Sequence, residues 1–278
     1  MNQLKPLSLL LFSLLAGPAL AQTQAPADEA EVINDVRYVV GAVLANGPIY
    51  FGQKERGTGL RPMFALRWGK VRLSSSGASG LIGEGNAGGA SADVFSNPDW
   101  KVRLGLRIDR GRKIEDDTSN RLEDLPRVRG TLRGRLMVSH RLSSDSSLSL
   151  SVAPDLLGHD GGTTVQLGYY KRLPTPDWLA PLGGQWSLGA GLSGGDDRYM
   201  NSYFGILPGA KRFAAYQPEG GLRNGSLGLG WQRSFGEKQS WVLFGGTSLQ
   251  RMLGPAADAP FIERKTTWSA DLGLAYRH

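Results

Sequence analysis

The sequence predicts an all-β fold: a transmembrane, antiparallel, up-and-down β-barrel of about twelve strands. Three observations predict this fold class. Apolar and polar side chains alternate along the C-terminal stretch, residues 265–278. No apolar run after the N-terminal leader approaches the roughly 18 to 20 residues that a membrane-spanning helix needs. The connections between the predicted strands alternate between long and short, as they do in outer-membrane barrels.

The C-terminal stretch is the clearest strand in the sequence. On an extended chain successive side chains point to opposite faces, so residues of one parity share a face. The apolar face carries Trp268, Ala270, Leu272, Leu274 and Tyr276. An aromatic residue lies near each end of this face, with small aliphatic residues between them. This is the arrangement of a lipid-facing strand with two interfacial girdles.

Residues 1–21 have the parts of an export signal peptide: Lys5, an apolar core and an Ala-Leu-Ala cleavage site. The apolar core is too short to anchor the chain in a membrane. We therefore expect a mature chain that begins at Gln22, with a periplasmic tail over 22–35. We expect residues 36–278 to form the barrel in the bacterial outer membrane.

The composition narrows the chemistry. The chain contains no cysteine, which excludes a disulfide framework and thiolate metal sites. It contains 39 glycines, which favour turns and close strand contacts over helices. The formal net charge is +7. Export argues against nucleic acid as a partner, so the basic residues are expected to form a solvated basic surface or to face anionic lipid headgroups or a lumen.

In the first half of the chain we predict strands at about 36–45, 61–68, 71–77, within 80–95, 100–109 and 127–142. The first has Tyr38, Val40, Ala42 and Leu44 on one face. Gly69 and Lys70 form a tight turn after the second. The fifth alternates apolar residues from Trp100 to Ile108 with charged ones. If the third and fourth merge into a loop, the barrel has ten strands.

In the second half we predict strands at about 146–154, 163–173, 185–193, 222–235, 240–251 and 265–278. In the first of these, leucines and a valine alternate with serines. The strand at 185–193 alternates Trp186 and aliphatic residues with Ser and Gly. In the strand at 222–235, Leu227, Leu229 and Trp231 face out.

The predicted connections fall into two classes. The long ones are 46–60, 110–126, 155–162, 194–221 and 252–264, and the short ones are 69–70, 96–99, 143–145 and 236–239, with 174–184 intermediate. Outer-membrane barrels have long extracellular loops and short periplasmic turns. An even number of strands also places both termini in the periplasm.

Several segments resemble the MipA/OmpV family of outer-membrane proteins over nearly all of the mature chain. The matching segments are Pro48–Gly52, Arg61–Gly69, Gly111–Lys113 followed by Glu115–Asp117, Asp155–Gly162, Asp196–Gly205, Tyr216–Leu222 and Leu253–Pro260. Two places depart from the family pattern. Residues 211–215 stand where the family usually has small residues. The chain ends in His278, whereas the family usually ends in an aromatic residue that the barrel-assembly machinery recognises.

The resemblance implies a scaffold that links a lytic transglycosylase to a penicillin-binding murein synthase at the outer membrane. Its contacts would use the tail 22–35 and the periplasmic turns, especially 174–184. Porin-like small-solute channels and surface adhesins are the alternatives that the resemblance leaves open. The other implied partners are outer-membrane lipid, lipopolysaccharide and the barrel-assembly machinery. The resemblance supplies no catalytic residue and no cofactor.

The longest connection, 194–221, is the main candidate site. A structureless segment of this length in a compact domain is usually functional, a plug or disordered, and its aromatic residues argue against disorder. The candidate residues are Asp197, Tyr199, Met200, Tyr203, Phe204, Phe213 and Tyr216. They form either a plug that closes the lumen or an exposed recognition surface, and we favour the plug.

Arginines form a second candidate site on the inner face of two neighbouring strands. The predicted lumen wall consists of Arg103, Arg107, Arg129, Arg133 and Arg135. A charged wall can select anions. The alternative, which we favour, is an internal salt-bridge network with acids such as Asp109 and Asp271, because the lumen of twelve strands is narrow.

An enzyme would need a nucleophile with a base, or a metal cluster. The chain has three histidines, His140, His159 and His278, and none lies in a catalytic or metal-binding motif. The acidic pairs 116–117 and 196–197 are interpreted as solvated loop charge or as ligands for cations that bridge lipopolysaccharide. The sequence therefore predicts a protein without enzymatic activity.

Overall fold

The computed structural model describes residues 36–75, 88–112, 125–175 and 177–278. The predicted signal peptide and tail lie outside these residues, as does the acidic pair 116–117. The signal peptide, the tail and the interpretation of this acidic pair therefore stay predictions. Among the described residues no helix is long and apolar enough to cross a membrane.

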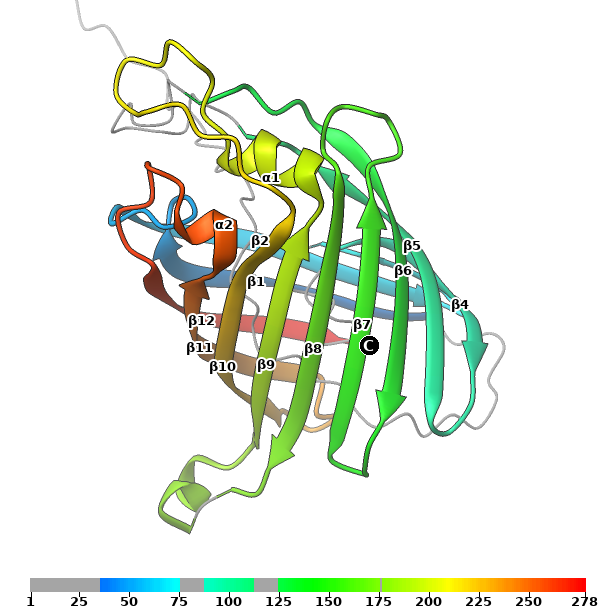
Figure 1. Ribbon diagram of the computed structural model, residues 1–278. Coiled ribbons are helices and arrows are strands. Elements are labelled where there is room, and N and C mark those ends of the chain that lie inside the picture. The colour runs from blue at the N-terminus through cyan, green and yellow to red at the C-terminus, as the bar shows by residue number, and fades with distance from the viewer. Residues whose placement is uncertain (1–35, 76–87, 113–124, 176) are drawn as a thin grey trace, which may run out of the picture.

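Twelve antiparallel strands form one closed barrel (Figure 1), in which each strand pairs with its sequence neighbours and the first pairs with the last. They are β1 (Val36–Pro48), β2 (Arg56–Trp68), β3 (Val71–Ser74), β4 (Gly89–Ser96), β5 (Trp100–Asp109), β6 (Thr131–Arg141), β7 (Ser146–Pro154), β8 (Thr163–Leu173), β9 (Gln185–Gly195), β10 (Gly221–Phe235), β11 (Trp241–Met252) and β12 (Thr266–Arg277). This confirms the predicted fold class and the count of twelve. The ten-strand alternative is wrong, because β3 and β4 both join the sheet.

The C-terminal strand closes the barrel. Its register against β1 pairs Leu44 with Leu272 and Val40 with Tyr276. Tyr38 and His278 exchange two backbone hydrogen bonds, of 3.1 and 3.0 Å, so the last residue still belongs to the seam. The alternation along β12 is as predicted: Trp268, Leu272 and Leu274 are exposed on the outside, whereas Ser269 and Ala275 are buried inside.

The outer surface has the composition of a lipid-facing band. Its large aliphatic and aromatic side chains are exposed, as lipid contact requires. At the end of the barrel with the short turns, exposed aromatics form a girdle of Tyr38, Trp68, Trp100, Phe235 and Trp241. At the other end Trp268 lies outside under the guanidinium of Arg56, 3.8 Å from its ring centre.

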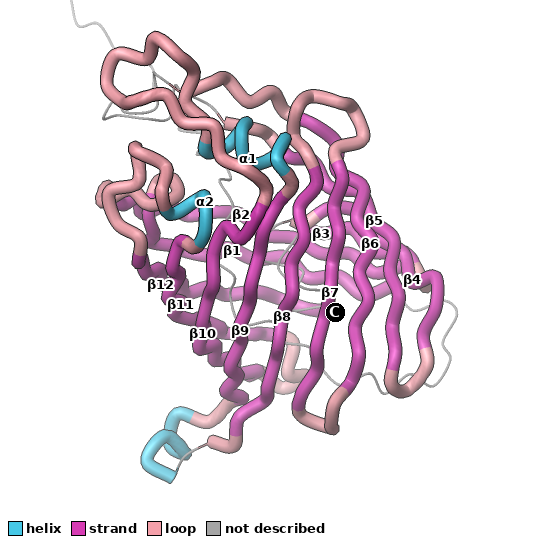
Figure 2. The backbone as a smooth tube through the Cα atoms, in the orientation of Figure 1, coloured by secondary structure: helices cyan, strands magenta, loops and turns pink. Residues whose placement is uncertain are grey.

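The two ends of the barrel differ, as Figure 2 shows. We call them the loop end and the turn end. The loop end carries the described residues 49–55, 110–112, 125–130, 155–162, 196–220 and 253–265, including the helices α1 (Asp197–Phe204) and α2 (Gly254–Ala257). The turn end carries tight turns and one longer connection, 174–184, which contains the 3₁₀ helix η3 (Asp177–Leu182).

Part of the lumen is filled by apolar side chains at the seam. A buried cluster on β1, β2 and β12, with Phe244 of β11 packed against it, consists of Val39, Val43, Met63, Ala65 and Ala275. The inward face is apolar here, and these side chains contact one another across neighbouring strands.

Two predicted boundaries and one segment predicted to be irregular differ from the structure. The loop predicted at 46–60 is shorter, because Asn46, Gly47 and Pro48 continue the ladder opposite residues 56–58. The sixth strand begins at Thr131 rather than Arg127. Val128, which the predicted strand 127–142 included, is buried at the loop end and pairs with Arg112 in an isolated bridge. Segment 194–221, predicted to be irregular, contains α1.

Candidate functional site

Four connections meet in one buried apolar cluster at the loop end, which we call the loop cap. It consists of Tyr50, Leu125, Val128, Tyr199, Met200, Tyr203, Phe204, Ile206, Met252, Ala256, Ala257, Ala259 and Phe261, with Phe51, Ala210, Phe213, Tyr216 and Ile262 packed against it. The rings of Phe204 and Phe261 stack with centres 6.2 Å apart, which joins the β9–β10 and β11–β12 connections. The β7–β8 connection joins through the hydroxyl of Ser202, which donates to the carbonyl of Asp160.

Helix α1 supplies the centre of the loop cap, and its sequence explains why it forms. Asp196 is its N-cap, and the carboxylate accepts a hydrogen bond of 2.8 Å from the backbone N–H of Tyr199. Four residues of the loop cap follow at positions that share one face of a helix: Tyr199, Met200, Tyr203 and Phe204. All four are at most 5% exposed. The second oxygen of Asp196 accepts from the N–H of Thr163, 2.8 Å away, which fixes α1 to the start of β8.

Arg112 is a buried guanidinium that binds three connections together. It donates to the Tyr50 hydroxyl at 3.1 Å, to the Tyr203 carbonyl at 3.0 Å, and to the Ser202 carbonyl at 3.2 Å. It also donates to the carbonyl of Pro126. Burial raises the pKa of Tyr50, and the positive charge of Arg112 opposes this rise. The Tyr50 phenol therefore stays protonated and donates to the Tyr203 carbonyl, 3.3 Å away.

A second polar chain connects the loop cap to the barrel wall. The Tyr203 hydroxyl donates to the Asp109 carboxylate at 2.9 Å, and Nε of Arg133 donates to the same oxygen at 2.6 Å. Burial and the charge of Asp109 both raise the pKa of Tyr203, so its phenol remains a donor. Arg133 also donates to the carbonyls of Gly161 and Gly162, at 2.7 and 2.9 Å. The β7–β8 connection is thus fixed to the same chain.

The remainder of the long connection lies over the cap. Ile206 and Tyr216 form an antiparallel bridge, and the Tyr216 hydroxyl donates to the Pro255 carbonyl in α2 at 2.8 Å. Phe213 packs against the cluster from outside. Asp197 is exposed, and its carboxylate accepts from the N–H of Gly220. The structure therefore brings together the aromatic and Met candidates of this segment. Asp197 lies outside the cluster, and its hydrogen bond with Gly220 joins the two ends of the connection.

The arginine candidates separate into three groups. Arg103 and Arg133 are in ion pairs, with Asp93 at 3.0 Å and Asp109 at 2.6 Å. Arg107 and Arg135 line a small recess in the wall together with Arg103. Arg129 precedes β6 and is exposed, so its assignment to the inner face of a strand is wrong.

Other residues of the lumen wall were missed or differ from expectation. Arg72 of β3, which was not predicted, pairs with Asp93 at 2.6 Å and is 2% exposed. Asp271, expected to pair with an arginine, lies inside β12. One of its carboxylate oxygens has no hydrogen-bond partner among the described residues.

The histidines lie apart from one another. His140 stacks on Trp100 with ring centres 4.2 Å apart, in the girdle at the turn end. Nδ1 of His159 is 2.7 Å from the carbonyl of Gly130. In the part of the chain that the structure describes, no three His, Cys, Asp or Glu side chains are grouped so as to hold a metal ion.

Comparison with known proteins identifies one family. The family model described as "MltA-interacting protein MipA" matches residues 40–278. No curated protein matches the chain.

Several solved outer-membrane structures resemble the barrel at low sequence identity. The Ralstonia pickettii toluene transporter TbuX is 11% identical, with 88% of this chain and 89% of that chain covered and a TM-score of 0.37. A bacterial polysaccharide outer membrane secretin is 9% identical, with 89% and 100% covered and a TM-score of 0.44. The NanC porin is 9% identical, with 87% and 99% covered and a TM-score of 0.36.

Proposed function

The chain belongs to the MipA family and is an outer-membrane β-barrel, and on this premise we propose that it is a scaffold whose loop end is closed. The scaffold would hold a lytic transglycosylase and a penicillin-binding murein synthase at the inner face of the outer membrane. In this orientation the loop end is extracellular and the turn end periplasmic, as loop lengths in outer-membrane barrels indicate.

The observation that carries this proposal is the loop cap. Its central side chains are as buried as a protein core: Met200 and Phe204 are 0% exposed and Phe261 is 1% exposed. Burying these groups stabilises the closed arrangement by roughly 1.5–3 kcal/mol per large side chain. A barrel with so much apolar contact over one mouth is better suited to holding partners than to passing solutes.

The turn end offers a surface for such partners. In η3, Trp178 is 78% exposed and Leu182 is 51% exposed, and no residue of η3 is buried. Exposed aromatic side chains are enriched in the centres of protein interfaces. We therefore assign contact with the murein enzymes to the connection that contains η3, together with the tail 22–35.

Cross-linking in intact cells tests the scaffold. The protein would carry an epitope tag in the turn at 236–239, and the co-purified proteins would be identified. We expect a lytic transglycosylase or a penicillin-binding synthase, and we expect the double variant Trp178→Ser/Leu182→Ser to lose it. The matched control is Leu207→Ser, an equally exposed leucine at the loop end (59%).

Two results would contradict the scaffold. One is recovery of only porins and barrel-assembly factors with the unmodified protein. The other is equal recovery of the murein enzymes with the double variant and the control. In the second case the contacts lie elsewhere, and the assignment to the connection that contains η3 fails.

A further inference from the structure

Two side chains of opposite charge face the lumen near the seam without a partner among the described residues. Asp271 of β12 lies on the inward face with Ser269 and Ala275, which are buried. One of its carboxylate oxygens is buried and accepts no hydrogen bond from any described residue. Arg61 of β2 lies on the inward face with Met63, and its buried Nε meets no acceptor in the same part of the chain.

The strand register places the two charges on either side of β1. Ala45 of β1 pairs with Asp271 on one side and with Gly59 of β2 on the other, and Arg61 is two residues from Gly59. Neighbouring strands are about 4.8 Å apart, and two residues along a strand span about 7 Å. The Cα atoms of Asp271 and Arg61 are therefore roughly 12 Å apart, a distance that a small molecule with a charge at each end can span.

The wall in front of Asp271 consists of small residues. Positions that pair across neighbouring strands form a row, and the row of Asp271 contains Gly59, Ala45 and, on β11, Gly246. A Cβ atom on Gly59 would meet nothing within 4 Å. The other residues of this row therefore supply no large side chain that would take the place of a ligand.

The rows on either side differ in polarity. Towards the loop end, the hydroxyl oxygens of Ser269 and Ser248 are 2.8 Å apart. Towards the turn end, Val43 belongs to the buried cluster at the seam, and Phe244 packs against this cluster. A ligand bound to Asp271 would therefore have hydroxyl groups on one side and apolar side chains on the other.

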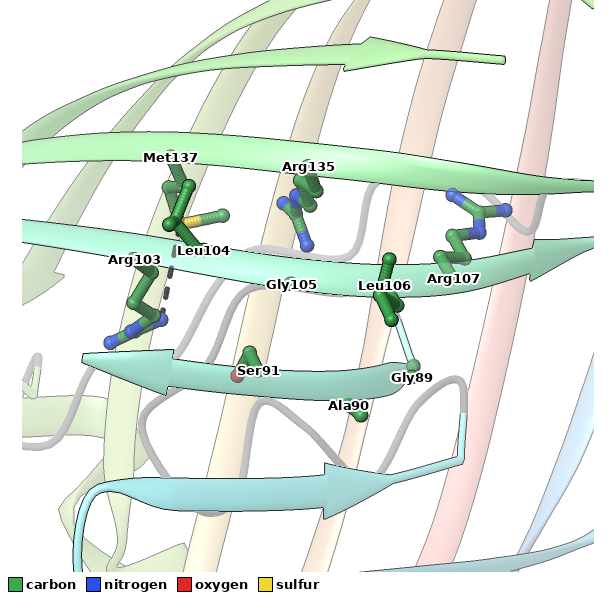
Figure 3. A pocket seen from close by; sticks show the side chains of 11 residues that line it. Gly89, Ala90, Ser91, Arg103, Leu104, Gly105, Leu106, Arg107, Arg135 and Met137 are labelled. Carbon is green, nitrogen blue, oxygen red and sulfur yellow. Dashed lines mark hydrogen bonds between the residues drawn. The ribbon is translucent and has the colours of Figure 1, made fainter. Parts of the chain in front are cut away.

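Further round the wall, inward arginines have carboxylate partners. Arg103 pairs with Asp93 at 3.0 Å, and Arg133 pairs with Asp109 at 2.6 Å. Figure 3 shows Arg103 on β5, where it also donates to the sulfur of Met137. A buried charge without a partner destabilises a fold. Two such charges of opposite sign at the seam are therefore better explained by a ligand than by stability.

We propose that the wall between Arg61 and Asp271 binds a small zwitterion of the dipeptide type. Its ammonium group pairs with the carboxylate of Asp271, and its carboxylate binds the guanidinium of Arg61 in the paired geometry that guanidinium groups favour. The charged ends of an extended dipeptide are separated by about 7 Å, and apolar side chains between them pack beside Val43 and Phe244. The site does not rest on the scaffold role.

Calorimetric titration of the purified, detergent-solubilised full chain with the dipeptide leucylglycine tests the site. Two analogues each lack one charge: N-acetyl-leucylglycine has no ammonium group, and leucylglycine amide has no carboxylate. We expect saturable binding of leucylglycine and at least tenfold weaker binding of either analogue.

Two variants each remove the preference for one charge. Asp271→Asn should bind leucylglycine and its acetylated analogue within about twofold of each other, because the partner of the ammonium group is lost. Arg61→Gln should in the same way cease to distinguish leucylglycine from its amide. The controls Glu237→Gln and Arg251→Gln change an exposed acid and an exposed arginine, and they should bind like the unmodified protein.

The melting temperature, measured as the heat-induced shift in gel migration, separates a binding role from a structural one. Removing a buried charge that has no protein partner should leave this temperature unchanged or raise it. The absence of saturable binding would overturn the site, as would unchanged preferences in both folded variants. A lower melting temperature with unchanged preferences would show a structural role instead. Because no murein enzyme is present, failure of the scaffold proposal would leave this result unaffected.

Discussion

At the scale of single residues, Arg112 is the side chain that links the most connections of the loop cap by hydrogen bonds. Its guanidinium is buried and donates to groups in three different connections. A buried donor set of this kind is costly to break, because the acceptors lose their partners without gaining water. The loop cap therefore depends on the hydrogen bonds of Arg112 as well as on its apolar contacts.

We predict that Arg112→Gln opens the loop cap while the barrel stays folded. The loss of several charge-assisted hydrogen bonds is expected to cost about 2–3 kcal/mol. Limited proteolysis of intact cells should then cut within 205–220 at least several times faster than in the unmodified protein. Arg251→Gln, an exposed arginine on β11, is the control, and equal cleavage of both variants would contradict the role of Arg112.

Asp155 gives a prediction that depends on pH. Burial acts to raise the pKa of its carboxyl group, but hydrogen bonds from the Thr131 hydroxyl and from the N–H groups of Gly161 and Leu157 lower it to about 2. A depressed folded-state pKa contributes stability above the unfolded pKa, near 4. This stability is lost as pH falls through about 2.

We expect Asp155→Asn to lower the free energy of unfolding by about 1 kcal/mol at pH 7, and the difference to shrink as the pH falls from 4 towards 2. Urea unfolding in detergent at a series of pH values measures this. Asp160→Asn is the neighbouring control, because Asp160 contributes its backbone carbonyl to Ser202. A difference that stays constant down to pH 2 would show that the charge of Asp155 is not involved.

At the scale of elements, the seam between β1 and β12 leaves no room for a side chain at Gly41. A Cβ atom on Gly41 would lie 2.3 Å from the carbonyl oxygen of Leu274. We predict that Gly41→Ala destabilises the barrel by about 1–3 kcal/mol, as overpacking does. Gly59→Ala on β2, where a Cβ would meet nothing within 4 Å, should be neutral. Heat-modifiable gel migration compares the two, and equal melting temperatures would refute the close approach at the seam.

The elements also show what the sequence could predict. Strands such as β5 and β12 were predictable because alternation with period 2 is a local property of the chain. Helix α1 was missed although its signals are present: Asp196 stands at an N-cap position, and Tyr199, Met200, Tyr203 and Phe204 follow at helical spacing. Eight residues between glycine-rich flanks are too few for this period to stand out.

The partners of the candidate residues could not be predicted from local pattern. Tyr203 meets Tyr50 and Arg112, which lie 153 and 91 residues away in the chain. Only closure of the barrel brings these connections to one end. Likewise, the pairing of Arg72 and Arg103 with Asp93 depends on the register of β4, which shifts between Asp93 and Phe95. A register shift of this kind leaves no periodic pattern in the sequence from which it could be predicted.

At the scale of the whole molecule, the two ends of the barrel have different characters. The loop end is covered by buried side chains from four connections, whereas no residue of η3 at the turn end is buried. Apolar side chains at the seam fill part of the lumen between these ends. In the orientation proposed above, the closed loop end faces outwards and η3 faces the periplasm.

Single-channel recording in planar lipid bilayers tests the central claim, which is closure by the loop cap. The purified protein is compared with a variant in which a short Gly-Ser linker replaces residues 197–219, so that β9 and β10 keep their bounds. We predict no stable conductance from the unmodified protein and clear open steps from the variant. Stable open channels from the unmodified protein, with no increase in the variant, would contradict closure by the loop cap.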